Sequence, residues 1–291
     1  MNFKESLFVS GHTACPGCGQ AIAAKLIVNT AGPTTIVCNA TGCLEVFSTL
    51  WPYSAWKIPW IHSLFENAAA VASGVESALR ALGKEDINVL AFAGDGGTAD
   101  IGLQALSGML ERGHNILFVC FDNEAYMNTG IQRSGLTPTG ADTTTSPSGK
   151  VNWGNPRPKK NVVGICAAHL IPYAASTSVG FPQDIIRKVK KALQIKGPKY
   201  IQVHIPCPLG WGSSADKTLE IAKLAVQTGL YPLVEYEHGK LVNVYKIRDR
   251  KPVEEYLKLQ RRFRHVLKNK ELIERIQKIA EFNVEFYNLS P

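Results

Sequence analysis

A short glycine-rich segment, GDGGTAD at residues 94–100, has the composition of a site for a phosphate group and a divalent cation. Gly94, Gly96 and Gly97 allow the backbone to turn tightly and to approach a ligand, and the free N–H groups at the start of a following helix can bind an anion. Asp95 adds a carboxylate, which is a hard oxygen ligand for a metal ion. Taken alone, the segment is equally typical of an ordinary turn between a strand and a helix.

A second polar cluster ends the next apolar run along the chain. The run NILFVCFD (115–122) is followed by Asn123, which stands 28 residues after Asp95. About 30 residues separate equivalent ends of two parallel strands joined by a helix, so Asp95 and Asn123 can meet on one ion. With a loop carbonyl near Ala125, they form a suitable ligand set for Mg²⁺.

Four of the seven cysteines could bind a metal. Cys15 and Cys18 flank a Pro-Gly turn in which backbone N–H groups can point at sulfur, Cys43 follows in ATGCLEV, and Cys207 stands in IPCPLGW. Four thiolates suit either a tetrahedral zinc ion or an iron–sulfur cluster. The spacing matches neither the paired zinc pattern nor the ferredoxin pattern. The residues alone therefore leave the metal, and even its presence, open.

The elements that must position these residues alternate between short apolar and amphipathic segments from about residue 61 to residue 206. We predict buried strands at 34–40, 87–94, 115–122, 162–168 and 200–206. We predict helices, each ending at a glycine, at 66–83, 100–113 and 182–197. Strands that are apolar throughout favour an α/β fold, a mostly parallel sheet with helices on both faces. Ligands bind such sheets at the carboxyl ends of the strands.

The remaining segments differ in composition. Residues 1–60 are loop-rich and short of helix formers, and residues 123–160 form a long segment of a kind that is typically functional. After Cys207 we expect a hairpin at 231–246 and a basic, amphipathic helical tail from 252 to about 286. We therefore divide the chain into an α/β domain at 1–206, with a cysteine-bearing N-terminal segment, and a C-terminal extension at 207–291.

The composition excludes several classes of protein. A 291-residue chain that is 45% hydrophobic and 19% charged is neither disordered nor a disulfide-dense miniprotein. Cys38, Cys120 and Cys166 lie within apolar runs, so we expect them to be core residues. No apolar run approaches the roughly 20 residues that span a bilayer, and the N-terminus lacks the layout of a signal peptide. We expect a cytoplasmic protein that does not bind membranes.

The net charge of +8 resides in one segment. Residues 240–278 contain 13 Lys or Arg and 5 Asp or Glu, so the rest of the chain is formally neutral. We interpret this segment as a solvated or subunit-contacting face and expect no nucleic-acid partner. A zinc-stabilised nucleic-acid-binding protein is an alternative, but it gives the pairing of Asp95 with Asn123 no purpose.

The chain also resembles a known family. GDG followed by an asparagine-containing strand end resembles the thiamine-diphosphate motif, and DNEAYMNTGIQRS (122–134) is similar to the form in 2-oxoacid:ferredoxin oxidoreductases. The resemblance runs from Gly11 to about Phe263 and is strongest to the β subunit of the pyruvate enzyme. It implies a thiamine-diphosphate-binding fold and a coenzyme A-dependent oxidative decarboxylation of a 2-oxoacid. Pyruvate is the first choice of substrate, ahead of oxalate and branched-chain 2-oxoacids.

The resemblance also implies roles for single residues. Asp95 and Asn123 would bind Mg²⁺ through their side chains, and Ala125 would bind it through its carbonyl. The stretch from Gly94 through Gly96 to Gly97 would contact the diphosphate. The residues expected near the rest of the cofactor are Gln20, Cys43 and Asn128, of which Asn128 would also lie near the substrate as a catalytic residue. The family often has threonine in place of Asn123, and glutamate in place of Gln20.

The cysteines and the partners follow from the same resemblance. Cys15, Cys18, Cys43 and Cys207 would hold one [4Fe–4S] cluster close to the thiamine ring. An α subunit would supply the activating glutamate and part of the substrate pocket, since Glu66 is better interpreted as a helix-start acid. Further γ and ferredoxin-like δ subunits would carry electrons to ferredoxin. A non-oxidative thiamine enzyme is the alternative, but it leaves the four cysteines unexplained.

Overall fold

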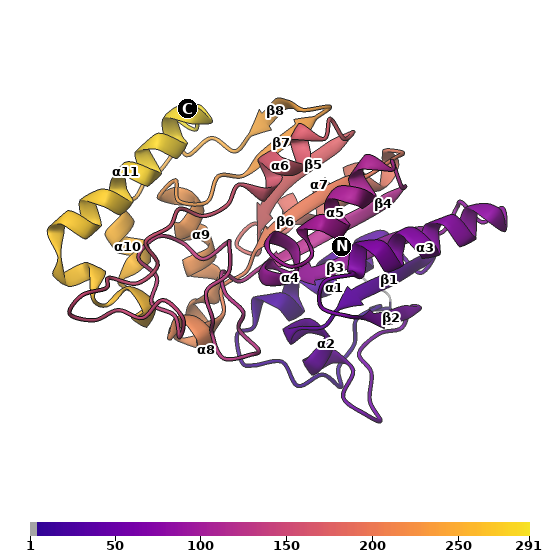
Figure 1. Cartoon of the computed structure of the whole chain (residues 1–291), viewed down its shortest axis with the longest axis horizontal. Helices are drawn as coiled ribbons and strands as arrows, with labels where there is room; N and C mark the ends of the chain where they lie inside the picture. The colour runs from indigo at the N-terminus through magenta and orange to yellow at the C-terminus, as the bar shows by residue number, and fades with distance from the viewer. Residues whose placement is uncertain (1–4) are drawn as a thin grey trace.

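The chain folds around one twisted sheet, which the computed structural model describes for residues 5–291 (Figure 1). Within these residues, the sheet has the strand order β2-β1-β3-β4-β6-β5-β7-β8. The first six strands in this order run parallel, and β7 and β8 join the edge in antiparallel pairings. The strands are β1 (Thr35–Ala40), β2 (Trp60–Ser63), β3 (Asn88–Gly94), β4 (Ile116–Asp122), β5 (Tyr173–Ser178), β6 (Lys199–His204), β7 (Val234–Glu237) and β8 (Lys240–Val244).

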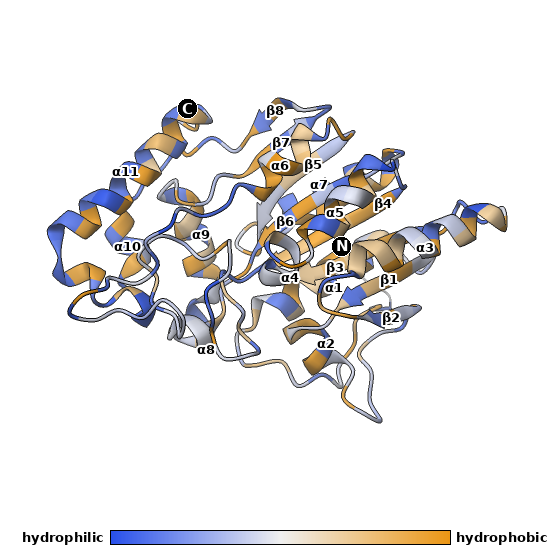
Figure 2. Cartoon of the chain, viewed as in Figure 1, coloured by the Kyte–Doolittle hydropathy of each residue, from blue (hydrophilic) through white to orange (hydrophobic). Residues whose placement is uncertain are grey.

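Helices cover both faces of this sheet, as the apolar strands predicted. Alternate strand residues face opposite layers: Ala91 packs with α3, α5 and α6, whereas Leu90 and Phe92 pack with α1 and α7. Apolar residues accordingly line the strands and the inner sides of the helices in Figure 2. The helices are α1 (Gly19–Ala31), α2 (Cys43–Ser48), α3 (Ala68–Ala81), α4 (Asp95–Ala99), α5 (Leu103–Glu111), α6 (Val162–Ala168), α7 (Pro182–Gln194), α8 (Pro208–Trp211), α9 (Thr218–Gln227), α10 (Val253–Leu257) and α11 (Lys270–Phe286).

The C-terminal part of the chain builds a third core beside the sheet. Helices α8 to α11 enclose a cluster of buried side chains that includes Trp211, Tyr256 and Phe263. The predicted hairpin is β7 and β8, and α11 is the main helix of the predicted tail. Figure 1 shows these helices grouped at one end of the sheet. No helix among residues 5–291 is both long enough and apolar enough to cross a membrane.

One predicted strand is wrong. Residues 162–168 form helix α6, and the strand beside β6 is β5 (Tyr173–Ser178). A short apolar run without clear periodicity cannot distinguish a strand from a buried helix. Here the side-chain oxygen of Asn161 accepts a hydrogen bond of 2.9 Å from the Gly164 N–H, which caps the helix start. The sequence of β5, YAASTS, is fully buried but lacks the apolar run that would mark it as a strand.

The expectation for residues 1–60 also needs correction. The segment predicted as loop-rich contains α1, a helix of 13 residues with the sequence GQAIAAKLIVNTA. Its Ala, Leu and Lys residues are good helix formers, but the flanking Cys, Pro and Gly residues conceal the pattern. By contrast, the predicted long segment after Asn123 has no helix or strand before α6 in the described structure. Leu136 and Asn155 are nonetheless fully buried, so parts of the segment are firmly packed.

Candidate active site

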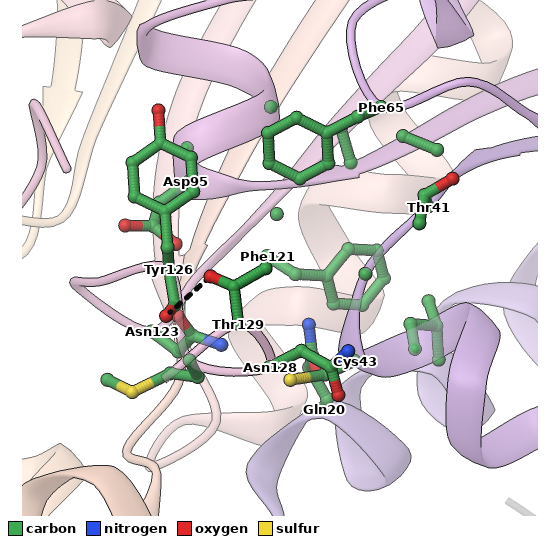
Figure 3. A pocket seen from close by; sticks show the side chains of 18 of the residues that line it. Gln20, Thr41, Cys43, Phe65, Asp95, Phe121, Asn123, Tyr126, Asn128 and Thr129 are labelled. Carbon is green, nitrogen blue, oxygen red and sulfur yellow. Dashed lines mark hydrogen bonds between the residues drawn. The ribbon is translucent and has the colours of Figure 1, made fainter. Parts of the chain in front are cut away.

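A cavity opens at the carboxyl ends of β1, β3 and β4, where ligands bind in parallel sheets (Figure 3). Strand β1 pairs with β2 on one side and with β3 on the other. The chain therefore adds β2 at one edge of β1 and the following strand, β3, at the opposite edge. The loops that follow β1 and β3 therefore diverge and leave a crevice between them. The cavity itself is small, about 70 Å³, and it opens to solvent.

The cavity brings together every residue that we predicted to contact thiamine diphosphate or Mg²⁺. These lining residues are Gln20, Cys43, Gly94, Asp95, Gly96, Gly97, Asn123, Ala125 and Asn128. Figure 3 shows Asp95 and Asn123 on one side and Cys43, Gln20 and Asn128 on another. Sequence reasoning missed several further lining residues, among them Asn39, Thr41, Phe65, Phe121, Tyr126 and Thr129. Asn39 and Thr41 could have been found, since they stand at the end of a predicted strand.

Three oxygen-bearing groups converge at the wall of the cavity. One terminal atom of the Asn123 carboxamide lies 2.9 Å from Asp95 Oδ1 and 2.8 Å from the Ala125 carbonyl oxygen. If the amide nitrogen occupies this position, it donates hydrogen bonds to both oxygens. If the amide oxygen occupies it, the Asn123 oxygen lies 2.9 Å and 2.8 Å from the other two oxygens, close to the edge of an octahedron with metal–oxygen bonds of 2.0–2.1 Å. The chemistry of these donors suits Mg²⁺.

Asp95 is a buried carboxylate with an unusual environment. It begins helix α4 directly after β3, and the Ser134 hydroxyl donates a hydrogen bond to its Oδ2. Burial raises the pKa of Asp95 well above its ordinary value, and the nearby Asp122 raises it further. The Ser134 hydrogen bond and Lys159 counteract this only in part. A cation in the cavity would favour the ionised form of Asp95.

The glycines of the GDGG segment have different roles in the packing. A side chain at Gly96 would collide with the ring of Tyr126, whose hydroxyl donates a 2.9 Å hydrogen bond to Asp100. A Cβ at Gly97 would lie 2.9 Å from the Phe65 carbonyl oxygen. At Gly94, in contrast, a Cβ would meet no described atom within 4 Å, because this residue borders the open cavity. Gly96 and Gly97 are needed for close packing, and Gly94 leaves room for a ligand.

The rest of the lining suits a ring system with a few polar groups. Phe65 and Phe121 contribute apolar surface. The side-chain oxygen of Asn39 is buried and has no hydrogen-bond partner among the described residues, so it can accept a hydrogen bond from a ligand. Asp95 is the single carboxylate among the described lining residues, and Glu66 is not part of the lining.

The four candidate cysteines lie near one another beside this cavity. Cys18 directly precedes α1, Cys43 begins α2, and Cys207 precedes α8 and accepts a 3.4 Å hydrogen bond from the Gly210 N–H. Burial, together with smaller effects of the thiols of Cys207, Cys18 and Cys15, raises the pKa of Cys43 to about 12. Burial likewise raises the pKa of Cys207 to about 11. The four thiols are therefore close enough to interact electrostatically.

These thiols do not form a compact set for a single ion. Among residues 5–291, no group of three or more His, Cys, Asp or Glu side chains is arranged to hold one metal ion. In a four-iron cluster each thiolate binds a different iron, so the thiolates stand farther apart than the ligands of one ion. The other three cysteines, Cys38, Cys120 and Cys166, are fully buried in the core, which confirms the prediction for them.

Comparison with known proteins identifies the family. The family described as "Thiamine pyrophosphate enzyme, C-terminal TPP binding domain" matches residues 36–203. Pyruvate synthase subunit PorB of Methanosarcina barkeri is 58% identical over 289 residues, which are 98% of this chain and 98% of that protein. The chain belongs to the β subunits of the 2-oxoacid:ferredoxin oxidoreductases. It is thus one subunit of a thiamine-dependent oxidoreductase.

Other members of this oxidoreductase family differ in the substrate that their names state. Ketoisovalerate oxidoreductase subunit VorB of Pyrococcus abyssi is 51% identical to this β subunit over 287 residues, covering 95% of this chain and 90% of that protein. The solved 2-oxoglutarate:ferredoxin oxidoreductase from Magnetococcus marinus shares the fold with a TM-score of 0.61 at 23% identity. That match covers 77% of this chain and 80% of the other.

Proposed function

We propose that this β subunit serves in the oxidative decarboxylation of pyruvate, with coenzyme A as acyl acceptor and ferredoxin as electron acceptor. The observation that carries the proposal is the position of Cys43, which lines the cofactor cavity and also interacts with the other three candidate thiols. An electron acceptor held there would lie directly beside the reacting cofactor. A non-oxidative thiamine enzyme has no use for this arrangement.

Pyruvate is the favoured substrate because of the relatives. A protein named as a pyruvate synthase subunit is 58% identical, whereas one named as a ketoisovalerate oxidoreductase subunit is 51% identical. A branched-chain 2-oxoacid is therefore the second candidate, and oxalate is the third. Initial rates of the assembled enzyme with pyruvate, 2-oxoisovalerate and oxalate, each with and without coenzyme A, test this order. A higher kcat/KM for 2-oxoisovalerate than for pyruvate would reverse it.

In the proposed site, Asp95, Asn123 and the Ala125 carbonyl hold Mg²⁺, and the Gly94 to Gly97 turn contacts the diphosphate. When bound, thiamine diphosphate supplies the carbanion chemistry that splits the carboxyl group from the 2-oxoacid. Phe65 and Phe121 exclude water from the cavity.

Two side chains complete the contacts that we propose for this chain. Asn128, which is exposed at the cavity, would donate a hydrogen bond to the substrate. Gln20 would contact the cofactor from helix α1. We also propose the [4Fe–4S] cluster on Cys15, Cys18, Cys43 and Cys207.

The proposed enzyme is active only with partner subunits. Thiamine activation needs a glutamate beside the pyrimidine ring, and the described lining contains none. An α subunit would supply it, so the active site would lie at a subunit interface in the cytoplasm. Ferredoxin-like δ and γ subunits would complete the electron path. Within this chain, we propose that residues 1–206 form the cofactor-binding domain and that residues 207–291 form an extension that contributes Cys207.

Iron content tests the observation that carries the proposal. We expect the β subunit to contribute about four irons to the anaerobically purified enzyme, in addition to those of the ferredoxin-like δ subunit. Cys207→Ala should lower the iron content by up to about four per β subunit and reduce the visible absorbance, because one thiolate is lost. The matched control is Cys166→Ala, since Cys166 is buried in the core and should leave the iron content unchanged. Zinc without iron in the purified enzyme, or unchanged iron in Cys207→Ala, would refute the cluster assignment.

A further inference from the structure

Four charged side chains form a buried network directly behind the converging oxygens. Lys159 Nζ lies 2.8 Å from Asp122 Oδ2 and 2.7 Å from Glu124 Oε1, and Arg262 Nη2 lies 2.6 Å from Glu124 Oε2. Lys159 is 20% exposed, and the other three side chains are at most 4% exposed. Two acids and two bases balance in charge, so burial of the network is tolerated. Direct cofactor contact does not explain the network, since none of its four residues lines the cofactor cavity, and Lys159 and Glu124 border a second cavity instead.

Glu124 is the central residue of this network and has an unusual backbone. Its φ of 67° lies in the left-handed region, which non-glycine residues rarely adopt. Glu124 stands between Asn123 and Ala125, so this turn brings the Ala125 carbonyl oxygen to within 2.8 Å of the Asn123 carboxamide, which itself lies 2.9 Å from Asp95 Oδ1. The glutamate side chain anchors the turn from the side away from the cofactor cavity.

Arg262 reaches the turn from the C-terminal part of the chain. It lies in the short 3-10 helix η2 (Arg261–Phe263), and its Nε donates a 2.9 Å hydrogen bond to Gln260 Oε1. Its guanidinium lies 3.7 Å from the centre of the Trp211 ring. Trp211 Nε1 in turn donates a 2.8 Å hydrogen bond to the Asn123 carbonyl oxygen. The C-terminal part therefore holds the turn at both Asn123 and Glu124.

We propose that Arg262 is a positioning residue that sets the Mg²⁺ affinity of the site through Glu124. This inference rests on the Mg²⁺ site of the proposed function. Mg²⁺ demands near-ideal octahedral geometry, so a small displacement of the Asn123 or Ala125 oxygen weakens binding. Partners that orient metal ligands typically change metal affinity by about 10–100-fold when they are replaced.

The test is a titration of the assembled enzyme with MgCl₂ at a fixed thiamine diphosphate concentration, with bound cofactor measured by calorimetry. Arg262→Met should raise the Mg²⁺ concentration for half-saturation by about 10–100-fold. Arg262→Lys keeps the charge but not the planar donor group, so it should have a smaller effect. Arg264→Met, an exposed arginine in the same segment, is the matched control and should bind Mg²⁺ like the wild type.

A double variant separates positioning from simple charge compensation. In Glu124→Gln/Arg262→Met the two charges that remain in the network, Lys159 and Asp122, still pair with each other, so thermal stability should recover toward the wild type. If Arg262 acts by positioning the turn, the Mg²⁺ concentration for half-saturation nevertheless stays raised in the double variant, because the glutamate anchor is still missing.

The outcomes separate this inference from the proposed function. Wild-type half-saturation in Arg262→Met or in the double variant would overturn the inference. If Arg262→Met does not assemble, the same comparison is made with Arg262→Lys. A wild-type enzyme whose cofactor binding is independent of Mg²⁺ would instead refute the Mg²⁺ site itself.

Discussion

At the scale of single residues, the site depends on a carboxylate that is costly to bury. Asp95 is 2% exposed, and its pKa is raised by burial and by Asp122. The Ser134 hydroxyl offers it a hydrogen bond but no charge. A carboxylate in this environment gains most from a cation, which explains why the protein places the Asn123 carboxamide beside it instead of another acid.

Replacing Asp95 should therefore abolish cofactor retention. Asp95→Ala removes one charged metal ligand, and we expect affinity for thiamine diphosphate in the presence of Mg²⁺ to fall by more than about 100-fold. Ser134→Ala, which only frees the carboxylate to rotate, should cost about 10-fold. Equilibrium dialysis of the assembled variants measures both effects, with iron content expected to stay constant. Asp86→Ala, at an exposed loop residue, is the control, and equal retention in Asp95→Ala and Asp86→Ala would contradict the assignment.

At the scale of elements, the hydrophobic periodicity and the glycine residues that end helices predicted most of the fold. The helices α3, α5 and α7 were found from their apolar faces, as was the order of strand, turn and helix around Asp95, whereas α9 was missed. The run at 162–168 failed because seven apolar residues carry no readable period, and the cap formed by Asn161 decides for a helix. Strand β5 was missed because small residues such as Ala174 and Ser176 give no apolar signal, although they are buried between neighbouring elements.

The same reasoning explains what was found of the site. Residues at the ends of predicted strands, such as Asp95 and Asn123, were placed together because parallel strands end at one edge. Phe65 and Tyr126 were missed because their rings reach the cavity from irregular segments, which no periodicity describes. Arg262 was hidden for a different reason. Its sequence context is a basic tail, and only the tertiary fold shows that its charge is buried against Glu124.

A pair of glycines tests the assignment of α3 and its end. Gly74 lies inside this helix, is exposed, and has open space where a Cβ would stand, so Gly74→Ala should stabilise the chain by about 0.5–1 kcal/mol. Gly83 follows the helix end and has a φ of 67°, so Gly83→Ala should destabilise the chain by about 1–2 kcal/mol. Chemical denaturation compares the two variants with the wild type. If both substitutions change the free energy of unfolding in the same direction, the helix boundary is misplaced.

At the scale of the whole molecule, distant parts of the chain converge on one cavity. Gln20 comes from α1, Asp95 from α4, and the turn at Asn123 is held by Trp211 and Arg262 from the C-terminal part. The C-terminal part must therefore be fixed to the sheet for the site to keep its geometry. Strand β7 provides this attachment, since it pairs with β5 and carries the buried Glu235.

Glu235 should make this attachment sensitive to acid. Its oxygens lie 2.7 Å from Arg187 Nη2 and 3.0 Å from Lys191 Nζ, and it accepts a 2.8 Å hydrogen bond from Tyr173. Burial opposes ionisation, but these partners lower the pKa of Glu235 below its ordinary value of 4.5. Because the folded pKa is lowered, the ionised form stabilises the fold above pH 4.5, and this stabilisation is lost as the pH falls further.

We therefore expect Glu235→Gln to lower stability by about 1–3 kcal/mol at pH 7, with the difference from the wild type shrinking below pH 4.5. Thermal unfolding midpoints at pH 7, 5 and 4 measure this trend. Glu237→Gln is the matched control: its carboxylate also contacts Lys191 but is 39% exposed, so the change should be small at every pH. A difference for Glu235→Gln that does not vary with pH would mean that its ionisation does not hold β7 in place.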